Sequence, residues 1–254
     1  MSLQGTASTT QYWEADPSIN PAMAAGSFTF FAWIKLPTSI PASAGFFSLS
    51  AFGAPHASTG LRISSSQVQI ANVDNSGVLT RAQNSPSANG NWQSICGTTT
   101  TVTPYIKRLF FANFSGDTDG TSAAATTCSR IDLGIYNPYL SPVSLPANCF
   151  IADVAAWMRE LGQAEISNLL HGVNPLTINK TALWFYYPLR GTFQDYGPNR
   201  FPMVAQGGAT PTWSDDNPPV QQARSRAAVP PRRHFLEINH NVQRRPRPTI
   251  VRVQ

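Results

Sequence analysis

The chain contains 254 residues, of which only 12% are charged, about half the share that is usual in globular proteins. Residues 1–220 carry ten Lys or Arg and twelve Asp or Glu, a net charge of −2, whereas residues 221–254 carry eight Arg and one Glu, a net charge of +7. The body therefore lacks a basic nucleic-acid-binding surface, and its composition suits a β-protein in an assembled setting better than a free cytosolic enzyme.

Stretches rich in aromatic and β-branched residues, separated by Gly, Pro and Ser, recur along the chain and predict β-strands. They are residues 27–36, 45–53, 60–73, 77–83, 91–101, 103–114, 130–136, 149–160 and 181–189. The apolar residues of 60–73 alternate only in part, so we expect two strands or a bend there. Short strands at this spacing are typical of a sandwich.

One helix is predicted over residues 161–172. Ile166, Leu169 and Leu170 fall at i, i+3 and i+4, and Gly172 is placed to end the helix. At about two turns it is too short to be stable without packing against another element. The composition changes after 209–220, so we predict a β-sandwich domain over residues 1–220 and an extended arm over 221–254.

The three cysteines, Cys96, Cys128 and Cys149, show no metal-type spacing such as C-x-x-C. We therefore expect free, largely buried thiols in a protein made in a reducing compartment. The first residues contain no basic segment followed by an apolar one, and no apolar run approaches the roughly 18 residues of a membrane span. These features favour a soluble protein without a signal peptide.

Five segments together resemble the laminin-G-like, concanavalin A-like lectin/glucanase superfamily. They are the opening QYWEADPSINPAMAAGSFTFFAWIKL (11–36), the hairpin NWQSICGTTTTVTPYIKRLFFANFSGD (91–117), the strand RIDLGIYNPY (130–139), the ending CFIADVAAWMRELGQAEISNLLHGVNP (149–175), and LWFYYPLRGTFQDYGPNRFPMVAQGGATPTWSDDNPPV (183–220). The last resembles a segment that often opens such domains, but here it follows the helix and has Gly197, Pro198 and Asn199 in place of a Gly-Asn-Gly run. This permuted order is similar to that of tailed-phage sequences.

The resemblance implies an all-β fold, a two-sheet antiparallel jelly-roll sandwich of about a dozen strands, with 181–189 returning to the sandwich edge. A shared aromatic and aliphatic interior between the sheets is expected from Phe28, Phe30, Trp33, Trp92, Ile151, Val154 and Trp157. Because the three tryptophans stand at core positions of the family, we interpret them as core residues and not as sugar platforms.

Catalytic groups are sparse, and we predict that the protein is not an enzyme. The E-x-D-x-E strand of the glucanase branch is missing, and the carboxylate pairs Glu14–Asp16, Asp117–Asp119 and Asp215–Asp216 are interpreted as solvated turns. None of the histidines, His56, His171, His234 and His240, belongs to a metalloprotease or hydrolase motif. Asp117 and Asp119 on a predicted loop over 114–121 could offer oxygens to calcium, but turn chemistry explains them equally, so we predict no metal and no cofactor.

The arm admits three interpretations: a loose tail, a phosphate-binding segment, and a segment that docks on another protein. It contains no Lys, and its β-favouring clusters at 234–238 and 249–253 could each add a strand to a neighbouring sheet. Arginine also suits bidentate pairing with carboxylates at an interface. We therefore favour docking. The predicted contact residues are Arg224, Arg226, Arg232, Arg233, Phe235, Ile238, Arg244, Arg245, Arg247, Ile250, Val251 and Arg252.

These observations favour a non-enzymatic virion structural protein, a capsid decoration or accessory protein that is made in the host cytoplasm. The expected partners are the major capsid protein or other virion subunits, in a homo-oligomer or a multi-copy assembly. No membrane is expected, and nucleic acid is disfavoured. The alternative is a carbohydrate-binding, lectin-like module on a phage tail or fibre, with a glycan as its partner.

Overall fold

The computed structural model describes residues 1–15, 27–50, 58–73, 79–87, 89–99, 107–111, 116–119, 130–137 and 142–219, with the backbone alone for 116–119. All of these residues belong to one unit, Met1–Ala223. The predicted arm lies outside the described residues, so its boundary near residue 221 stays a prediction. Within the described part, no helix has the length and apolar character that a bilayer crossing requires.

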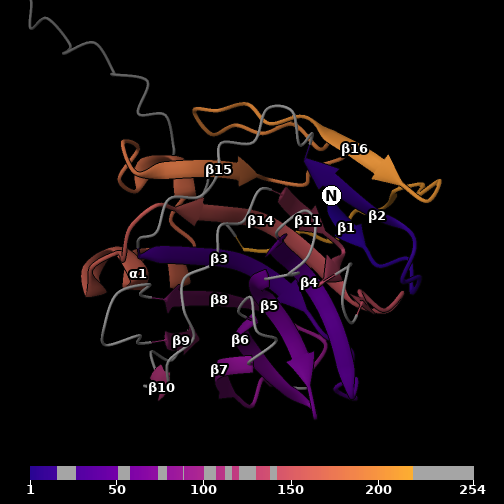
Figure 1. Ribbon diagram of the computed structural model, residues 1–254, viewed down its shortest axis with the longest axis horizontal. Coiled ribbons are helices and arrows are strands. Elements are labelled where there is room, and N and C mark those ends of the chain that lie inside the picture. Colours follow the sequence, from indigo (N-terminus) through magenta and orange to yellow (C-terminus); the bar gives the residue numbers. More distant parts are fainter. Residues whose placement is uncertain are drawn as a thin grey trace, which may run out of the picture. The chain divides into compact units, whose positions relative to one another are not determined.

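Two antiparallel sheets pack face to face and form a sandwich (Figure 1). In spatial order the first sheet contains β10 (Gly116–Asp119), β9 (Lys107–Phe111), β8 (Trp92–Thr99), β3 (Phe28–Lys35), β14 (Phe150–Trp157), β1 (Ser2–Gln4) and β17 (Thr212–Ser214), and β15 (Leu183–Tyr187) also pairs with β14. The second sheet contains β16 (Met203–Gln206), β2 (Tyr12–Ala15), β11 (Arg130–Leu133), β4 (Ser43–Ser50), β5 (Ser58–Ser64), β6 (Gln67–Val73) and β7 (Leu79–Asn84). A small ladder joins β12 (Ile135–Tyr136) to β13 (Val143–Ser144).

Each stretch that the sequence predicts as a strand contains one. The segment 60–73 forms two strands, because Ser65 and Ser66 adopt φ values of +51° and +60°, as in the tight turns that fit hairpin twist. The predicted loop over 114–121 is wrong for Gly116–Asp119, which pairs with β9 and forms an edge strand. Strand β15 pairs with β14 beside β1, as the permuted order implies.

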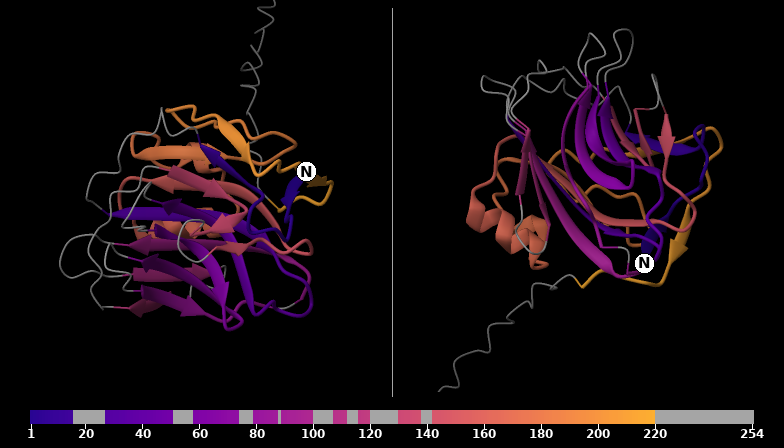
Figure 2. Two further views of the ribbon diagram at one scale, coloured as in Figure 1. Left: turned by 45° about the vertical axis from the view of Figure 1, so that its right-hand side comes forward. Right: turned by 90° about the horizontal axis from the view of Figure 1, so that it is seen from below.

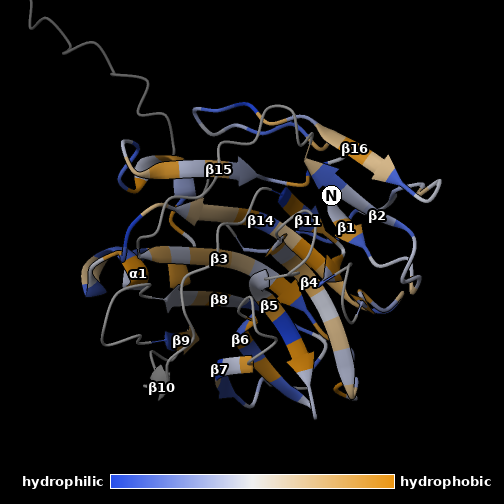
Figure 3. Ribbon diagram, viewed as in Figure 1, coloured by the Kyte–Doolittle hydropathy of each residue, from blue (hydrophilic) through white to orange (hydrophobic). Residues whose placement is uncertain are grey.

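The interior between the sheets is built by alternation along the strands. On β3 the residues Phe28, Phe30 and Ile34 face the second sheet, and Figure 3 shows polar and apolar residues alternating on β5. A bulge interrupts this pattern on β14, where the register shifts between Ala152 and Ala155. The bulge lets Ile151 and Val154 both face the interior although they are three residues apart.

The outer face of the first sheet is also covered by apolar groups. Helix α1 (Gln163–Leu170) and the short 3₁₀ helix η1 (Pro175–Thr177) belong to this outer layer. In the right-hand view of Figure 2, α1 lies on one side of the first sheet and the second sheet lies on the other. The predicted helix is confirmed: its three apolar residues are buried, and Gly172, with φ +86°, follows its end.

Trp33 and Trp157 are core residues, as predicted, but the prediction that the three tryptophans fill the space between the sheets is wrong. Trp33 and Trp157 pack in a second apolar cluster on the outer face of the first sheet, under α1, which we call the outer cluster and which includes Phe31, Leu169 and Tyr186. The half-buried Trp92 packs against the same cluster. Side chains alternate between the two faces of a strand, and Trp33 follows Phe30 by three residues on β3, so its side chain points to the other face. The indole of Trp157 donates a hydrogen bond to the carbonyl of Ile178 at 3.0 Å, which ties the outer layer to the sheet.

The last described segment is fixed to the first sheet through Asp216. Its carboxylate pairs with Lys35 of β3 and accepts a hydrogen bond from the indole of Trp92 at 3.0 Å. The hydrogen bonds from Lys35 and Trp92 lower the pKa of Asp216. Residues near 216 are therefore held against the sandwich.

Candidate ligand-binding pocket

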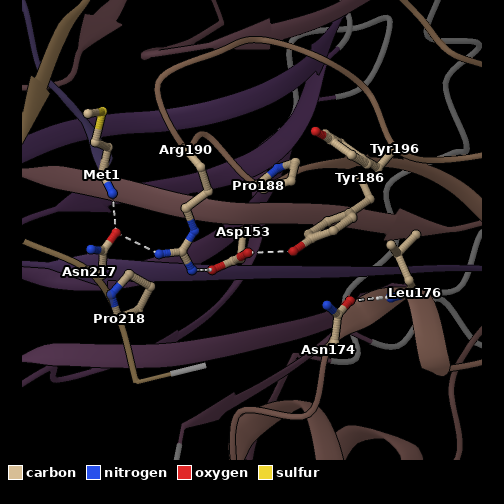
Figure 4. Close-up of a pocket in the computed structure, with 10 residues that line it drawn as sticks. All are labelled: Met1, Asp153, Asn174, Leu176, Tyr186, Pro188, Arg190, Tyr196, Asn217 and Pro218. Atoms are coloured by element: carbon tan, nitrogen blue, oxygen red, sulfur yellow. Dashed lines mark hydrogen bonds and ion pairs between the residues drawn. The ribbon is translucent and has the colours of Figure 1, made fainter. Parts of the chain in front are cut away.

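A pocket of about 560 Å³ opens on the outer face of the first sheet, beside η1 (Figure 4). Five segments that lie far apart in the sequence contribute to its lining. The lining residues are Met1, Asp153, Asn174, Leu176, Tyr186, Pro188, Arg190, Tyr196, Asn217 and Pro218. The pocket therefore exists only once the fold has brought β14, η1, the turn after β15 and the last described segment together.

Asp153 is the buried polar centre of this pocket. It is the bulged residue of β14, with φ +51°, and this backbone turns its side chain away from the interior and toward the pocket. The side chain is 1% exposed, yet it accepts hydrogen bonds from the Tyr186 hydroxyl at 2.5 Å and from Nη2 of Arg190 at 2.7 Å. Burial raises the pKa of Asp153, and the charge of Arg190 and the Tyr186 hydroxyl oppose that shift.

Arg190 reaches the pocket because of the backbone just before it. Leu189 adopts φ +56°, a conformation that is uncommon for a residue other than glycine, and its own side chain is buried in the sandwich interior. The turn therefore presents Arg190 on the outer side. Its Nη1 donates to Oδ1 of Asn217 at 2.7 Å, so the guanidinium bridges Asp153 and the last described segment.

The segment 191–202 holds Tyr196 over the pocket, and Asp195 organises this segment. The Asp195 carboxylate accepts backbone N–H bonds from Tyr186 at 2.8 Å, Gly197 at 2.7 Å and Phe201 at 3.0 Å. Burial raises the pKa of Asp195, although these three N–H groups favour its ionised form. A side chain at position 197 would collide with the backbone of Phe185 at 2.8 Å, so glycine is required there.

The pocket combines aromatic surface with hydrogen-bonding groups. Tyr196 is 42% exposed, and its backbone N–H donates to the carbonyl of Tyr186 at 2.8 Å, which places the two tyrosines next to each other. Asn174 uses its Oδ1 to accept the N–H of Leu176 at 2.9 Å, so its amide group is anchored at the start of η1. Apolar walls with a few fixed polar groups are typical of small-molecule sites. The arrangement offers a ring face for stacking and several donors and acceptors for hydroxyl groups.

A second group of buried polar residues lies on the face of the second sheet that points away from the interior. Glu14 and Asp132 are cross-strand neighbours on β2 and β11, and Glu14 forms an ion pair with Nη1 of Arg130 at 2.6 Å. Asp132 is 0% exposed, accepts hydrogen bonds from the hydroxyls of Ser50 at 2.5 Å and Ser48 at 3.2 Å, and burial raises its pKa to about 7. The interpretation of Glu14 as part of a solvated turn is therefore wrong, because it stands on a strand and is buried.

Most site residues predicted from the sequence lie outside the described residues. This holds for the whole arm, from Arg224, Arg226, Arg232, Arg233, Phe235 and Ile238 to Arg244, Arg245, Arg247, Ile250, Val251 and Arg252, and for Cys128, His56, His234 and His240. The side chains of Asp117 and Asp119 are also not described. Among the described residues, no group of three or more His, Cys, Asp or Glu side chains is arranged to hold a metal ion.

Comparisons with known proteins place the architecture. The chain matches no protein-family model and no curated protein. A candidate carbohydrate binding protein from Bacteroides ovatus is similar with a TM-score of 0.58 and 15% identity, over 87% of this chain and 61% of that one. Domains LG4-5 of the mouse laminin alpha1 chain are similar with a TM-score of 0.45 and 15% identity, over 61% and 40%. The receptor binding domain of botulinum neurotoxin type G is similar with a TM-score of 0.44 and 12% identity, over 59% and 38%.

The chain spans less than two thirds of the length of each of these three structures. At these identities the likeness to the Bacteroides ovatus protein shows the fold alone. The two-sheet antiparallel jelly-roll sandwich with one short helix, implied by the resemblance to laminin-G-like domains, is confirmed. The tailed-phage origin stays a prediction.

Proposed function

We propose that the described domain is a carbohydrate-binding module and that the pocket around Asp153 is its binding site. The observation that carries the proposal is the exposed Tyr196 ring beside a buried carboxylate that Tyr186 and Arg190 hold in place. A sugar ring presents an apolar face that an aromatic side chain can cover, and hydroxyl groups that can bond to the Arg190 guanidinium, which is 32% exposed and is held in place by Asp153.

The fold supports this proposal over the capsid role. The Bacteroides ovatus protein, which shares the fold over 87% of this chain, is named as a candidate carbohydrate binding protein. That protein is named for binding and not for a reaction. The proposal accordingly assigns recognition and no reaction to the pocket.

The first experiment is a glycan array with the full chain, followed by measurement of the Kd for the best ligand by NMR titration. Replacing Tyr196 by Ala removes the stacking surface, and we expect the Kd to rise about tenfold, which corresponds to about 1.4 kcal/mol. Leu79→Ala is the matched control, because Leu79 is similarly exposed at 40% but stands on β7 of the second sheet. Equal affinities of Tyr196→Ala and the native chain for every bound glycan would place sugar binding elsewhere, and an empty array would refute the module.

A role as a virion decoration protein is a second proposal, carried by the sequence resemblance and the arginine-rich composition of residues 221–254. It is compatible with sugar binding, since the arm and the pocket residues do not overlap in sequence. One deletion distinguishes the two functions. A chain without residues 221–254 should keep its glycan affinity and lose its association with purified capsids, and retained association would refute the docking role of the arm.

A further inference from the structure

The ionised groups that line the pocket are not balanced in charge. They are the Arg190 guanidinium, the Met1 ammonium and the Asp153 carboxylate, so positive groups outnumber negative ones. Both positive groups donate hydrogen bonds to Oδ1 of Asn217, which places them next to each other on the wall that the last described segment forms (Figure 4). The pocket therefore carries an excess of positive charge.

The charges also differ in how far a ligand can reach them. The Asp153 side chain is 1% exposed, so it has no surface open to a ligand, whereas the Arg190 side chain is 32% exposed and Met1 is 47% exposed. A ligand that enters from solvent contacts the positive groups and not the carboxylate. An anionic group on the partly exposed Arg190 keeps part of its water, so it loses less hydration than it would in a fully buried ion pair.

The hydrogen-bonding groups of the lining leave more donors than acceptors open. The side-chain oxygens of Asp153, Asn174 and Asn217 already accept hydrogen bonds within the protein. A guanidinium has about five N–H groups, of which Arg190 uses one toward Asp153 and one toward Asn217. The Nδ2 group of Asn174 has no acceptor among the described residues. These open donors fit a ligand group that only accepts hydrogen bonds.

We infer that the pocket binds acidic sugars, which carry a carboxylate or a sulfate group, more tightly than their neutral counterparts. The inference rests on the proposed function, because it names the class of carbohydrate that the same pocket takes. The acidic group accepts charge-assisted hydrogen bonds from Arg190, and the Tyr196 ring covers the apolar face of the sugar. The hydroxyl of a neutral sugar would instead bring a donor to a lining whose acceptors are largely in use.

The test compares sugars that differ in one acidic group, by NMR titration of the full chain at low ionic strength. The pairs are galactose with galacturonic acid, galactose with galactose 6-sulfate, and glucose with glucuronic acid. The acidic member of at least one pair should bind about fivefold more tightly, as expected for an ion pair at a partly exposed site. Added salt should lower this affinity ratio, because it screens exposed charges. The pair with the largest ratio distinguishes a carboxylate from a sulfate ligand.

Two substitutions locate the preference. Arg190→Gln removes the charge but leaves an amide that can still donate to Asp153, and the affinity ratio should fall to about one. Asn174→Asp keeps an oxygen for the N–H of Leu176 but replaces the Nδ2 donor by a carboxylate oxygen, so the ratio should fall by about threefold. Asn89→Asp is the matched control. Oδ1 of Asn89 likewise accepts an N–H from two residues further on, at 3.0 Å, but outside the pocket lining, so its ratio should equal that of the native chain.

The outcomes separate the inference from the proposed function. Equal affinities within every pair, with binding that is lost in Tyr196→Ala, would overturn the inference while the proposed function stands. A native preference that persists unchanged in a folded Arg190→Gln variant would also overturn it, and if that variant does not fold, an unchanged ratio in Asn174→Asp would do the same. Failure of every sugar to bind, neutral or acidic, would overturn the proposed function itself.

Discussion

Replacing Asp195 by Ala should remove much of the stability of the domain, because this one carboxylate satisfies three backbone donors. It accepts the N–H groups of Tyr186, Gly197 and Phe201 at distances between 2.7 and 3.0 Å. The first lies on β15 and the other two lie in the segment 191–202, so the side chain fastens that segment to the first sheet. An alanine offers no acceptor to any of the three.

The magnitude follows from the number of bonds and from burial. Hydrogen bonds to a charged acceptor contribute about 1.5–3 kcal/mol each, and a buried donor that is left without a partner costs about 1–3 kcal/mol. Burying the carboxylate offsets part of this gain, as its raised pKa indicates. We therefore expect a net loss of about 3 kcal/mol in the free energy of unfolding.

The assay is urea unfolding followed by tryptophan fluorescence, for which the chain has six tryptophans. With an m-value of about 3 kcal/mol/M for a domain of this size, the midpoint should fall by about 1 M. Asp215→Ala is the matched control, since Asp215 is exposed and its loss should change stability by less than about 0.5 kcal/mol. A loss below about 1 kcal/mol in Asp195→Ala would show that the segment 191–202 is held by its apolar contacts and not by the carboxylate.

Three further changes test other parts of the structure. Gly207→Ala should destabilise the domain by about 3 kcal/mol, because its Cβ would collide with a backbone oxygen. Gly208→Ala, at φ +71° in open space, should cost only about 1 kcal/mol. Urea unfolding measures both losses, and equal losses would refute the collision. Burial raises the pKa of Asp132 from 3.8 to about 7, so the folded state binds the proton more tightly, and the free energy of unfolding should fall by about 4 kcal/mol as pH rises from 4 through 7. Asp132→Asn should lack this slope, and parallel pH profiles of the two proteins would contradict the assignment. Cys96 and Cys149 are buried, and burial raises the pKa of Cys149 to about 12. Both thiols should therefore react with iodoacetamide only after unfolding, which peptide mass spectrometry can measure. Rapid labelling in the native state would disprove their burial.

The strands could be predicted because each apolar run ends at a turn signal, as Ile34 and Lys35 end β3 just before Pro37. Which side chains of a strand face the interior could not be predicted, because both faces of the first sheet are buried. On β3 the residues Phe30 and Phe31 are both apolar and both covered, one by the second sheet and one by the outer cluster. A run without polar alternation carries no information about which side chain points where, so Trp33 and Trp157 were assigned to the wrong layer.

The pocket could not be predicted either, but the reason is different. Asp153, Arg190 and Asn217 come from distant parts of the chain, and two of these depend on positive φ angles at Asp153 and Leu189. Neither residue is glycine, so neither marks an unusual backbone in the sequence. The turn-rich composition around Asp195 and Gly197 was visible, but composition alone does not show that a carboxylate there would gather three backbone donors.

The pairing of β1 with β17 has a practical consequence for engineering. It sets Ser2 directly opposite Ser214, so the first and last described strands run side by side in the same sheet. A short linker could therefore join these two strands, and the chain could be opened instead at the hairpin turn of Ser65 and Ser66 without breaking a strand pairing. By the same geometry, residues 1–218 can be inserted as a cassette into a surface loop of a carrier protein whose two attachment points lie close together, and the pocket, which Met1, Asn217 and Pro218 help to line, would travel with it.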